Sequence, residues 1–282
     1  ADGRWGVGFV EQLASLTTAD IAASSDLTGS AALGGDWELE STTGAIEADP
    51  LFQASTFETW SGVLLDLPDL SKETAPLTFT IRASNVVDVA GGAQPRRYNI
   101  SGTINGGVRD DTFVVKAIFN SPNLAIDGGG GKNTLDVSNL KTALSFRIDG
   151  KNQLTLLDAS SNSILLTAKN IQNVEGATQN DTFNFASSFF RSGKLETING
   201  GIGTESTLDY SAFRGPVTVN LTAGTATALE AGGRFGVRNI QKVVGSGKGD
   251  TLVGRTAKDI LAGGPGADVI EGKGGSDTLA GG

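Results

Sequence analysis

The sequence contains no cysteine, no histidine and no methionine among its 282 residues. Without cysteine there are no disulfide bonds, and without cysteine and histidine the usual zinc sites, Ser-His-Asp triads and Cys-His nucleophiles are excluded. The chain also lacks any run of about 18 apolar residues, the length that a membrane-spanning helix needs. We therefore predict no membrane span and no catalysis of these kinds.

Phosphate-binding motifs are absent as well. Neither GxxxxGK[ST] nor a strand–GxGxxG–helix arrangement occurs. Catalysis would then depend on carboxylate pairs or on Arg, Lys and Tyr, as in glycosidases and some polysaccharide lyases. The only tyrosines are Tyr98 and Tyr210, and Tyr210 lies in a Leu-Asp-Tyr-Ser corner that indicates a structural role. We predict that the chain is not an enzyme and has no catalytic residues.

Positive charge is missing from one long segment. Residues 5–71 carry 11 carboxylates and no Lys or Arg, whereas the whole chain has a net charge of −9. No strongly basic patch exists, which argues against nucleic acid as a partner. The acidic segment is interpreted first as a solvated face, and second as a calcium-dependent or cationic contact surface.

Glycine, by contrast, is abundant, with 40 residues, and it is interspersed with Thr, Val, Ile and Leu. This composition favours an all-β fold, a parallel β-solenoid. Near the N-terminus, residues 5–17 place apolar side chains at helical spacing, which predicts one short helix. Short strands are expected at 37–40, at 44–47 and within 52–67.

Four nonapeptides in unbroken register occupy the last 38 residues. They begin at Gly245, Gly254, Gly263 and Gly272. Each carries aspartate at its sixth position and a large aliphatic residue at its eighth. Such a repeat forms half a turn of a parallel β-roll, in which a tight turn precedes a short strand. Since two repeats make one coil, Asp250 is predicted to stack on Asp268, and Asp259 on Asp277.

The turns offer the oxygen ligands that calcium prefers, namely carboxylates and main-chain carbonyls. Because stacked carboxylates repel one another, we expect the roll to be disordered without the ion. The predicted metal residues of the four repeats are Asp250, Asp259, Asp268, Asp277, Gly245, Gly247, Gly263, Pro265, Gly266, Gly272 and Gly274.

These nonapeptides resemble the RTX (hemolysin-type calcium-binding) repeats of secreted bacterial proteins. Residues 263–271 fit the pattern GGxGxDxUx at every position. Lys248 replaces the fourth-position glycine of the first repeat, and residues 255–258 replace most glycines of the second. The resemblance implies several bound Ca²⁺ ions and an extracellular or cell-surface location.

A longer repeat precedes the nonapeptides. Asp111, Asp181 and Asp250 each end a glycine-containing turn and are followed by Thr and an apolar residue, at intervals of 70 and 69. We therefore divide the chain into an N-terminal acidic segment (1–76), a β-solenoid of two modules of roughly 70 residues (77–244) and a β-roll (245–282) that continues beyond the chain end. Stacked coils of this kind form one rod.

Asp111 and Asp181 are further candidate calcium ligands, alongside the interpretation that they cap main-chain amides at corners. Asn133 and Glu205 occupy the corresponding place in two other glycine-rich turns, and the same two interpretations stay open for them.

Residues 18–48 resemble the end of an uncharacterised N-terminal domain found on very long bacterial surface proteins. That resemblance implies an exported setting and no known catalytic residues. The predicted function is a calcium-stabilised structural module of a secreted surface protein, such as an adhesin stalk, matrix fibre or filament, with self-association as a further expectation. The alternative is a calcium-dependent module that binds acidic polysaccharide, with Lys248, Arg255, Lys258 and Lys273 as candidate contacts.

Overall fold

The computed structural model describes residues 12, 14–16, 22–23, 41–43, 70, 72–82, 86–91, 96–99, 102–117, 124–149, 153–185, 195–227 and 233–282. The chain divides into two compact units, one of Ala1–Leu67 with Arg97–Asn99 and one of Pro68–Arg96 with Ile100–Gly282.

In the first unit, residues 12 and 14–16 are helical, within the range where apolar spacing predicts a helix. Strand β1 (Ala22–Ala23) pairs antiparallel with β2 (Ser41–Thr42). The strands expected at 37–40, at 44–47 and within 52–67 lie outside the described residues.

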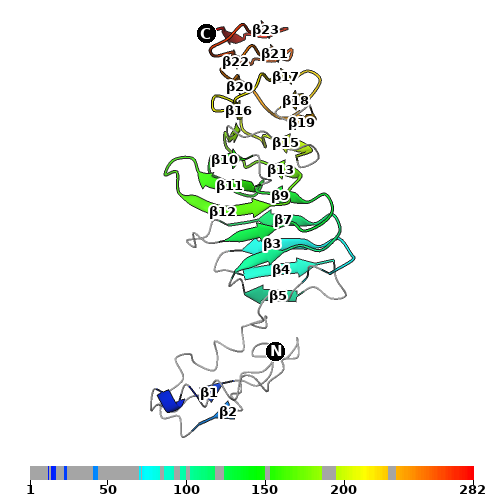
Figure 1. Cartoon of the computed structure of the whole chain (residues 1–282), viewed down its shortest axis with the longest axis vertical. Helices are drawn as coiled ribbons and strands as arrows, with labels where there is room; N and C mark the ends of the chain where they lie inside the picture. The colour runs from blue at the N-terminus through cyan, green and yellow to red at the C-terminus, as the bar shows by residue number, and fades with distance from the viewer. Residues whose placement is uncertain are drawn as a thin grey trace. The chain divides into compact units, whose positions relative to one another are not determined.

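The second unit consists of two sheets between which the chain alternates (Figure 1). The first sheet contains β3 (Thr78–Arg82), β4 (Val86–Ala90), β7 (Thr112–Val115), β9 (Thr134–Asp136), β13 (Asn173–Glu175), β15 (Thr197–Asn199), β17 (Thr218–Asn220), β18 (Thr225–Thr227), β19 (Arg234–Arg238), β21 (Thr251–Val253) and β23 (Val269–Glu271). The second contains β6 (Thr103–Asn105), β8 (Ala125–Asp127), β10 (Leu144–Ile148), β11 (Gln153–Asp158), β12 (Ile164–Lys169), β14 (Thr182–Phe185), β16 (Thr207–Asp209), β20 (Lys242–Val244), β22 (Ile260–Ala262) and β24 (Thr278–Ala280). Between β4 and β6 the chain forms β5 (Arg96–Asn99).

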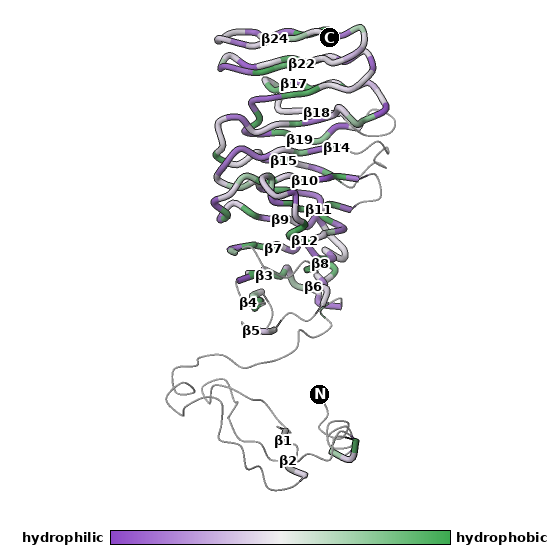
Figure 2. Tube along the Cα trace, turned by 90° about the vertical axis from the view of Figure 1, so that its left-hand side faces the viewer, coloured by the Kyte–Doolittle hydropathy of each residue, from purple (hydrophilic) through white to green (hydrophobic). Residues whose placement is uncertain are grey.

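Strands in successive coils pair in parallel, as expected for a solenoid. β7 pairs with β9, β14 with β16, and β21 with β23. Figure 2 shows the coils lying one above another, with hydrophobic segments recurring along the strands. Because β20 pairs with β22 and β17 with β21, the four nonapeptides continue the same two sheets without a break.

The core lies between the sheets and is filled by the inward residue of each short strand. Phe79 faces Phe113 in register, with ring centroids 4.7 Å apart, and Phe146 faces Phe183 at 4.5 Å. All four rings are completely buried. In the strict repeats this inward position is aliphatic, as at Leu252. Smaller side chains therefore take the place of the stacked rings in that part of the core.

Antiparallel meanders interrupt the parallel pattern, a feature that periodicity did not predict. β10, β11 and β12 fold back on one another within the second sheet, and β17, β18 and β19 do so within the first. β3 and β4 form an antiparallel pair of the same kind. After each, the first strand pairs in parallel with a later one: β3 with β7, β10 with β14, and β17 with β21.

These pairings explain the 70-residue interval. The three strands of each meander belong to one sheet, so the chain does not cross within a meander. From β7 to β14, and again from β14 to β21, the chain therefore crosses between the sheets five times. An odd number of crossings places successive copies on opposite sheets. Equivalent turns of neighbouring modules therefore lie on opposite flanks of the stack. The boundaries at 76/77 and 244/245 stay a prediction about sequence modules.

Candidate functional site

The sixth residue of each nonapeptide lies immediately before a strand, so that equivalent residues of successive coils are neighbours. Thr251 pairs with Val269 and Ile260 with Thr278, which brings residues 250 and 268 together on one flank and 259 and 277 on the other. The N–H of Asp250 donates to Oδ1 of Asp268 at 2.9 Å. The N–H of Asp259 donates to Oδ1 of Asp277 at the same distance.

The aspartates of the 70-residue series cap main-chain amides. Oδ1 of Asp111 accepts from the N–H of Leu77 at 2.7 Å, and Oδ2 accepts from the N–H of Gly107 at 2.6 Å. Asp181 is bound in the same way by the N–H groups of Leu144 (2.9 Å) and Ala177 (2.6 Å). The capping interpretation therefore describes what both carboxylates do in the structure.

Asp250 repeats this arrangement and adds a hydroxyl group. Its Oδ1 accepts from the N–H of Val217 at 2.7 Å and its Oδ2 from the N–H of Ser246 at 2.6 Å. Ser246 also donates its hydroxyl to the same carboxylate, at 3.0 Å to Oδ1 and 3.2 Å to Oδ2. Asp250 is thus a structural cap by the same geometry as Asp111 and Asp181.

One coil further along, each module places a side chain that receives the N–H of the capping aspartate. Asn133 accepts from the N–H of Asp111 at 2.9 Å, Ser206 from that of Asp181 at 3.2 Å, and Asp268 from that of Asp250 at 2.9 Å. Ser206, not Glu205, fills this position in the second module. Because its turn is one residue longer, Glu205 is displaced onto the surface, where Lys242 lies 3.9 Å from it. Glycine spacing alone did not identify Ser206.

Asn133 and Ser206 have a second function that Asp268 cannot perform. The amide of Asn133 donates to the carbonyls of Gly130 (2.9 Å) and Asn170 (3.0 Å), and the hydroxyl of Ser206 donates to the carbonyl of Gly200 (2.7 Å). An ionised carboxylate only accepts hydrogen bonds. Oδ2 of Asp268 is buried and has no hydrogen-bond partner among the described residues.

A cation bound at the Asp268 turn would therefore supply the missing partner of Oδ2 of Asp268. A buried carboxylate oxygen without a donor is costly unless a positive charge accompanies it. Gly263 makes room for this carboxylate, because a Cβ there would overlap Oδ2 of Asp268. Hard oxygen ligands from a carboxylate and neighbouring carbonyls suit Ca²⁺. The described residues contain no cluster of three or more acidic, His or Cys side chains, so main-chain oxygens would complete such a site.

The other predicted residues lie in the same stacked turns. Gly245 packs against the carbonyl of Gly263, and Gly266 lies against the main chain of Lys248. The N–H of Gly274 donates to the carbonyl of residue 255 at 3.2 Å. Gly247 and Pro265 occupy the third positions of their turns, and Gly272 lies beside the carboxylate of Asp277. Calcium ligation by these residues stays a prediction.

Asp259 differs from its three counterparts in the strict repeats. Its Oδ1 accepts from Nη2 and Nε of Arg255, at 2.6 and 3.0 Å, and its Oδ2 accepts from the main-chain N–H of Arg255 at 2.5 Å. The side chain of Asp259 is completely buried, and that of Arg255 is 27% exposed. Composition and spacing did not reveal this ion pair.

Burial also changes the acid–base properties of two capping aspartates, Asp181 and Asp111. It raises the pKa of Asp181 from 3.8 to about 6, although the N–H groups of Leu144 and Ala177 favour the ionised form. Burial also raises the pKa of Asp111. Asp181 is therefore partly protonated in mildly acidic solution, whereas an exposed aspartate is ionised there.

Comparison with protein families yields two matches. Residues 1–64 match a domain of unknown function, DUF4347, and residues 244–279 match the RTX calcium-binding nonapeptide repeat (4 copies). None of the curated proteins matches the chain. Among the described residues, no helix combines the length and apolar character required to cross a bilayer. Repeats of this family bind several calcium ions per array and typically serve structural roles in secreted proteins. Residues 244–279 of this chain thus match RTX calcium-binding repeats, and their strands extend the β-solenoid.

Proposed function

We propose that the chain is a calcium-stabilised structural module of a secreted bacterial surface protein, acting as part of an adhesin stalk, matrix fibre or filament. The observation that carries this proposal is the buried, unpartnered Oδ2 of Asp268 at the point where RTX repeats continue the solenoid sheets. A calcium ion there joins successive coils of one stack.

Calcium availability supplies the switch. The ion is scarce inside cells and reaches millimolar levels outside, and binding to a site that forms only on folding contributes directly to folding. The strict repeats would therefore complete their fold after export. Residues 77–244 differ, because neutral donors such as Asn133 and Ser206 already satisfy their turns. They provide a folded surface on which the repeats stack.

Ion pairs weigh against the alternative of a polysaccharide-binding face. Arg255 is engaged by Asp259, and Lys273 lies 2.6 Å from Glu271. On the strand faces, Lys169 pairs with Asp127 at 2.9 Å and Arg238 with Glu175 at 3.6 Å. These four cations already have acidic partners, so that of the four candidate contacts only Lys248 and Lys258 have no ion pair among the described residues, whereas recognition of acidic sugars requires positive charge facing the ligand.

The test is circular dichroism of the full chain in chelator, followed by titration with calcium to about 10 mM, well above the range of calcium sensors. We expect a gain in β-structure with Ca²⁺ and a much smaller one with Mg²⁺, which demands a stricter geometry. Asp268→Asn should weaken the response. Asp209→Asn is the matched control, since Asp209 lies outside the nonapeptides and, among the described residues, accepts one exposed hydrogen bond, from the N–H of Ser211. A wild-type chain with no calcium response contradicts the proposal.

Self-association is tested separately by sedimentation velocity. If the module assembles into fibres, we expect calcium-loaded chains to form species larger than the monomer that disperse in chelator. A strictly monomeric calcium-loaded chain at high concentration would contradict the filament form of the proposal and leave the stalk form.

A further inference from the structure

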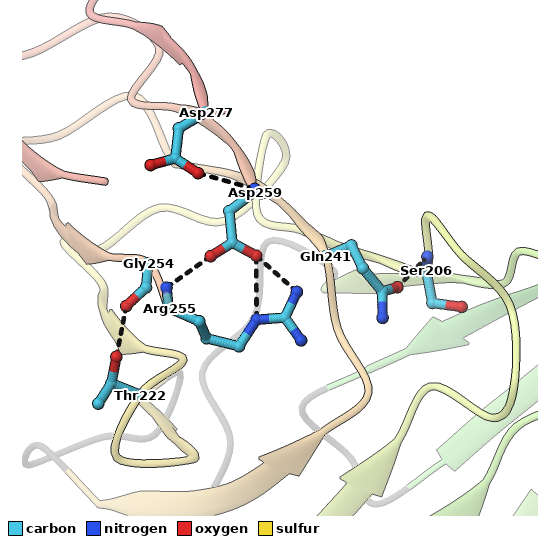
Figure 3. A network of polar contacts seen from close by, with 7 residues as sticks. All are labelled: Ser206, Thr222, Gln241, Gly254, Arg255, Asp259 and Asp277. Carbon is cyan, nitrogen blue, oxygen red and sulfur yellow. Dashed lines mark hydrogen bonds and ion pairs between the residues drawn. The ribbon is translucent and has the colours of Figure 1, made fainter. Parts of the chain in front are cut away.

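At the Asp259 turn, four oxygens that could face an ion already have partners within the chain. Both carboxylate oxygens of Asp259 accept hydrogen bonds from Arg255, as Figure 3 shows. The carbonyl of Gly254 accepts from the hydroxyl of Thr222 at 2.6 Å. The carbonyl of Arg255 accepts from the N–H of Gly274 at 3.2 Å.

The opposite flank has no such cation. In the Asp268 turn the second position is Gly264, which has no side chain, and Oδ2 of Asp268 is left without a partner. In the Asp250 turn the second position is Ser246, whose hydroxyl contributes a hydrogen bond but no charge. Among these three turns, positive charge reaches the carboxylate only at Asp259.

We propose that the guanidinium of Arg255 takes the place of a calcium ion at the Asp259 turn, so that this turn, unlike the Asp268 turn, does not depend on calcium. This inference rests on the proposed calcium-stabilised function and assigns the two turns different roles. The Asp259 turn is held by a covalently attached cation and forms without metal. The Asp268 turn closes only when calcium binds.

Physical chemistry favours this assignment. A buried carboxylate needs a proton, a metal ion, a hydrogen-bonded cation or several neutral donors such as those around Asp250. Arginine is charged at every physiological pH and is more weakly hydrated than lysine, so it is suited to a partly buried ion pair. The side chain bonds a carboxylate only four residues away, which lowers the entropy cost of the contact compared with recruiting a free ion.

The experiment compares wild type, Arg255→Ser and Lys258→Ser in the full chain. Lys258 lies in the same turn, is exposed and carries the same charge, which makes it a matched control. Calcium stoichiometry is measured by equilibrium dialysis, and the melting temperature is measured in chelator and in saturating calcium.

We expect Arg255→Ser to lower the melting temperature in chelator, to bind one more calcium ion than wild type, and to recover most of its melting temperature in calcium. Lys258→Ser should behave as wild type in all three measurements. An Arg255→Ser chain with unchanged stoichiometry overturns the inference, because Arg255 then forms only an ordinary ion pair.

A double variant covers the case in which Arg255→Ser does not fold in chelator. Arg255→Ser with Asp259→Asn removes the buried charge and is expected to fold in chelator and to keep the wild-type stoichiometry, as the natural Asn133 turn suggests. Extra calcium bound by this double variant would contradict the inference. If wild type itself fails to bind calcium, the proposed function fails, and that result is distinct from either outcome above.

Discussion

Oδ1 of Asp181 accepts a hydrogen bond of 2.9 Å from the main-chain N–H of Leu144, which precedes it by 37 residues. The meander β10–β12 begins at Leu144, and strand β13 follows it before Asp181. The same bond joins Asp111 to Leu77 and Asp250 to Val217. Each of these aspartates therefore joins the coil that follows an antiparallel segment to the start of that segment's first strand.

Replacing Asp181 by alanine should destabilise the solenoid even when no calcium is present. The change leaves the buried N–H groups of Leu144 and Ala177 without acceptors, at a cost of about 1–3 kcal/mol for each group. We expect the free energy of unfolding in chelator, measured by urea denaturation, to fall by about 2–4 kcal/mol. Asp209→Ala, which removes an exposed cap, is the control. Equal losses in the two variants would show that Asp181 has no special role.

Ser206 and Glu205 allow a comparison of adjacent residues. Ser206→Ala removes the acceptor for Asp181 and the donor to Gly200, both buried, and should cost about 1–3 kcal/mol. Glu205→Ala removes a long ion pair at the surface and should change the free energy of unfolding by less than about 0.5 kcal/mol. The reverse order in urea denaturation would place the sixth-position function on Glu205.

Acidity should stabilise the calcium-free chain through Asp181. Its pKa is raised from 3.8 to about 6 by burial, so between these values the folded state holds a proton that the unfolded state has lost. The contribution is fully present below about pH 4 and is lost as the pH rises through about 6.

The measurement is the free energy of unfolding as a function of pH, for wild type and for Asp181→Asn. The stability difference, wild type minus variant, should decrease by about 2–3 kcal/mol from about pH 4 to about pH 7, because a shift of two pKa units corresponds to that energy. Other titrating groups, including Asp158, whose pKa is lowered to about 2 by hydrogen bonds from Ser160 and Ser161, are common to both chains. A constant difference would mean that the pKa of Asp181 is normal.

Glycine substitutions should separate a crowded position, Gly263, from an open one, Gly247. In Gly263→Ala, the new Cβ overlaps the Asp268 carboxylate, so we expect a loss of about 1–3 kcal/mol and a weaker calcium response. At Gly247 a Cβ meets no atom within 4 Å, so Gly247→Ala should be neutral or more stable by up to about 1 kcal/mol. Thermal melts with and without calcium test both, and equal effects would contradict the close approach at Gly263.

The sequence alone predicted the stacked architecture and the neighbours within it. A nine-residue period with aspartate and an aliphatic residue at fixed places determines which residues are neighbours, because two repeats complete a coil and residues 18 apart must meet. Asp250 beside Asp268 and Asp259 beside Asp277 follow directly. The family match to RTX calcium-binding repeats confirms the recognition of residues 244–279.

Tertiary structure decided the features that depend on contacts between distant residues. The meanders are invisible to a periodicity argument, because they add antiparallel strands without changing the alternation of apolar residues. Ser206 replaces Glu205 because a longer turn shifts the register by one residue. Arg255 engages Asp259, while Oδ2 of Asp268 has no hydrogen-bond partner among the described residues, although both aspartates hold the sixth position. Which carboxylate is paired depends on the side chains and carbonyls around each turn, and that information exists only once the coils have stacked.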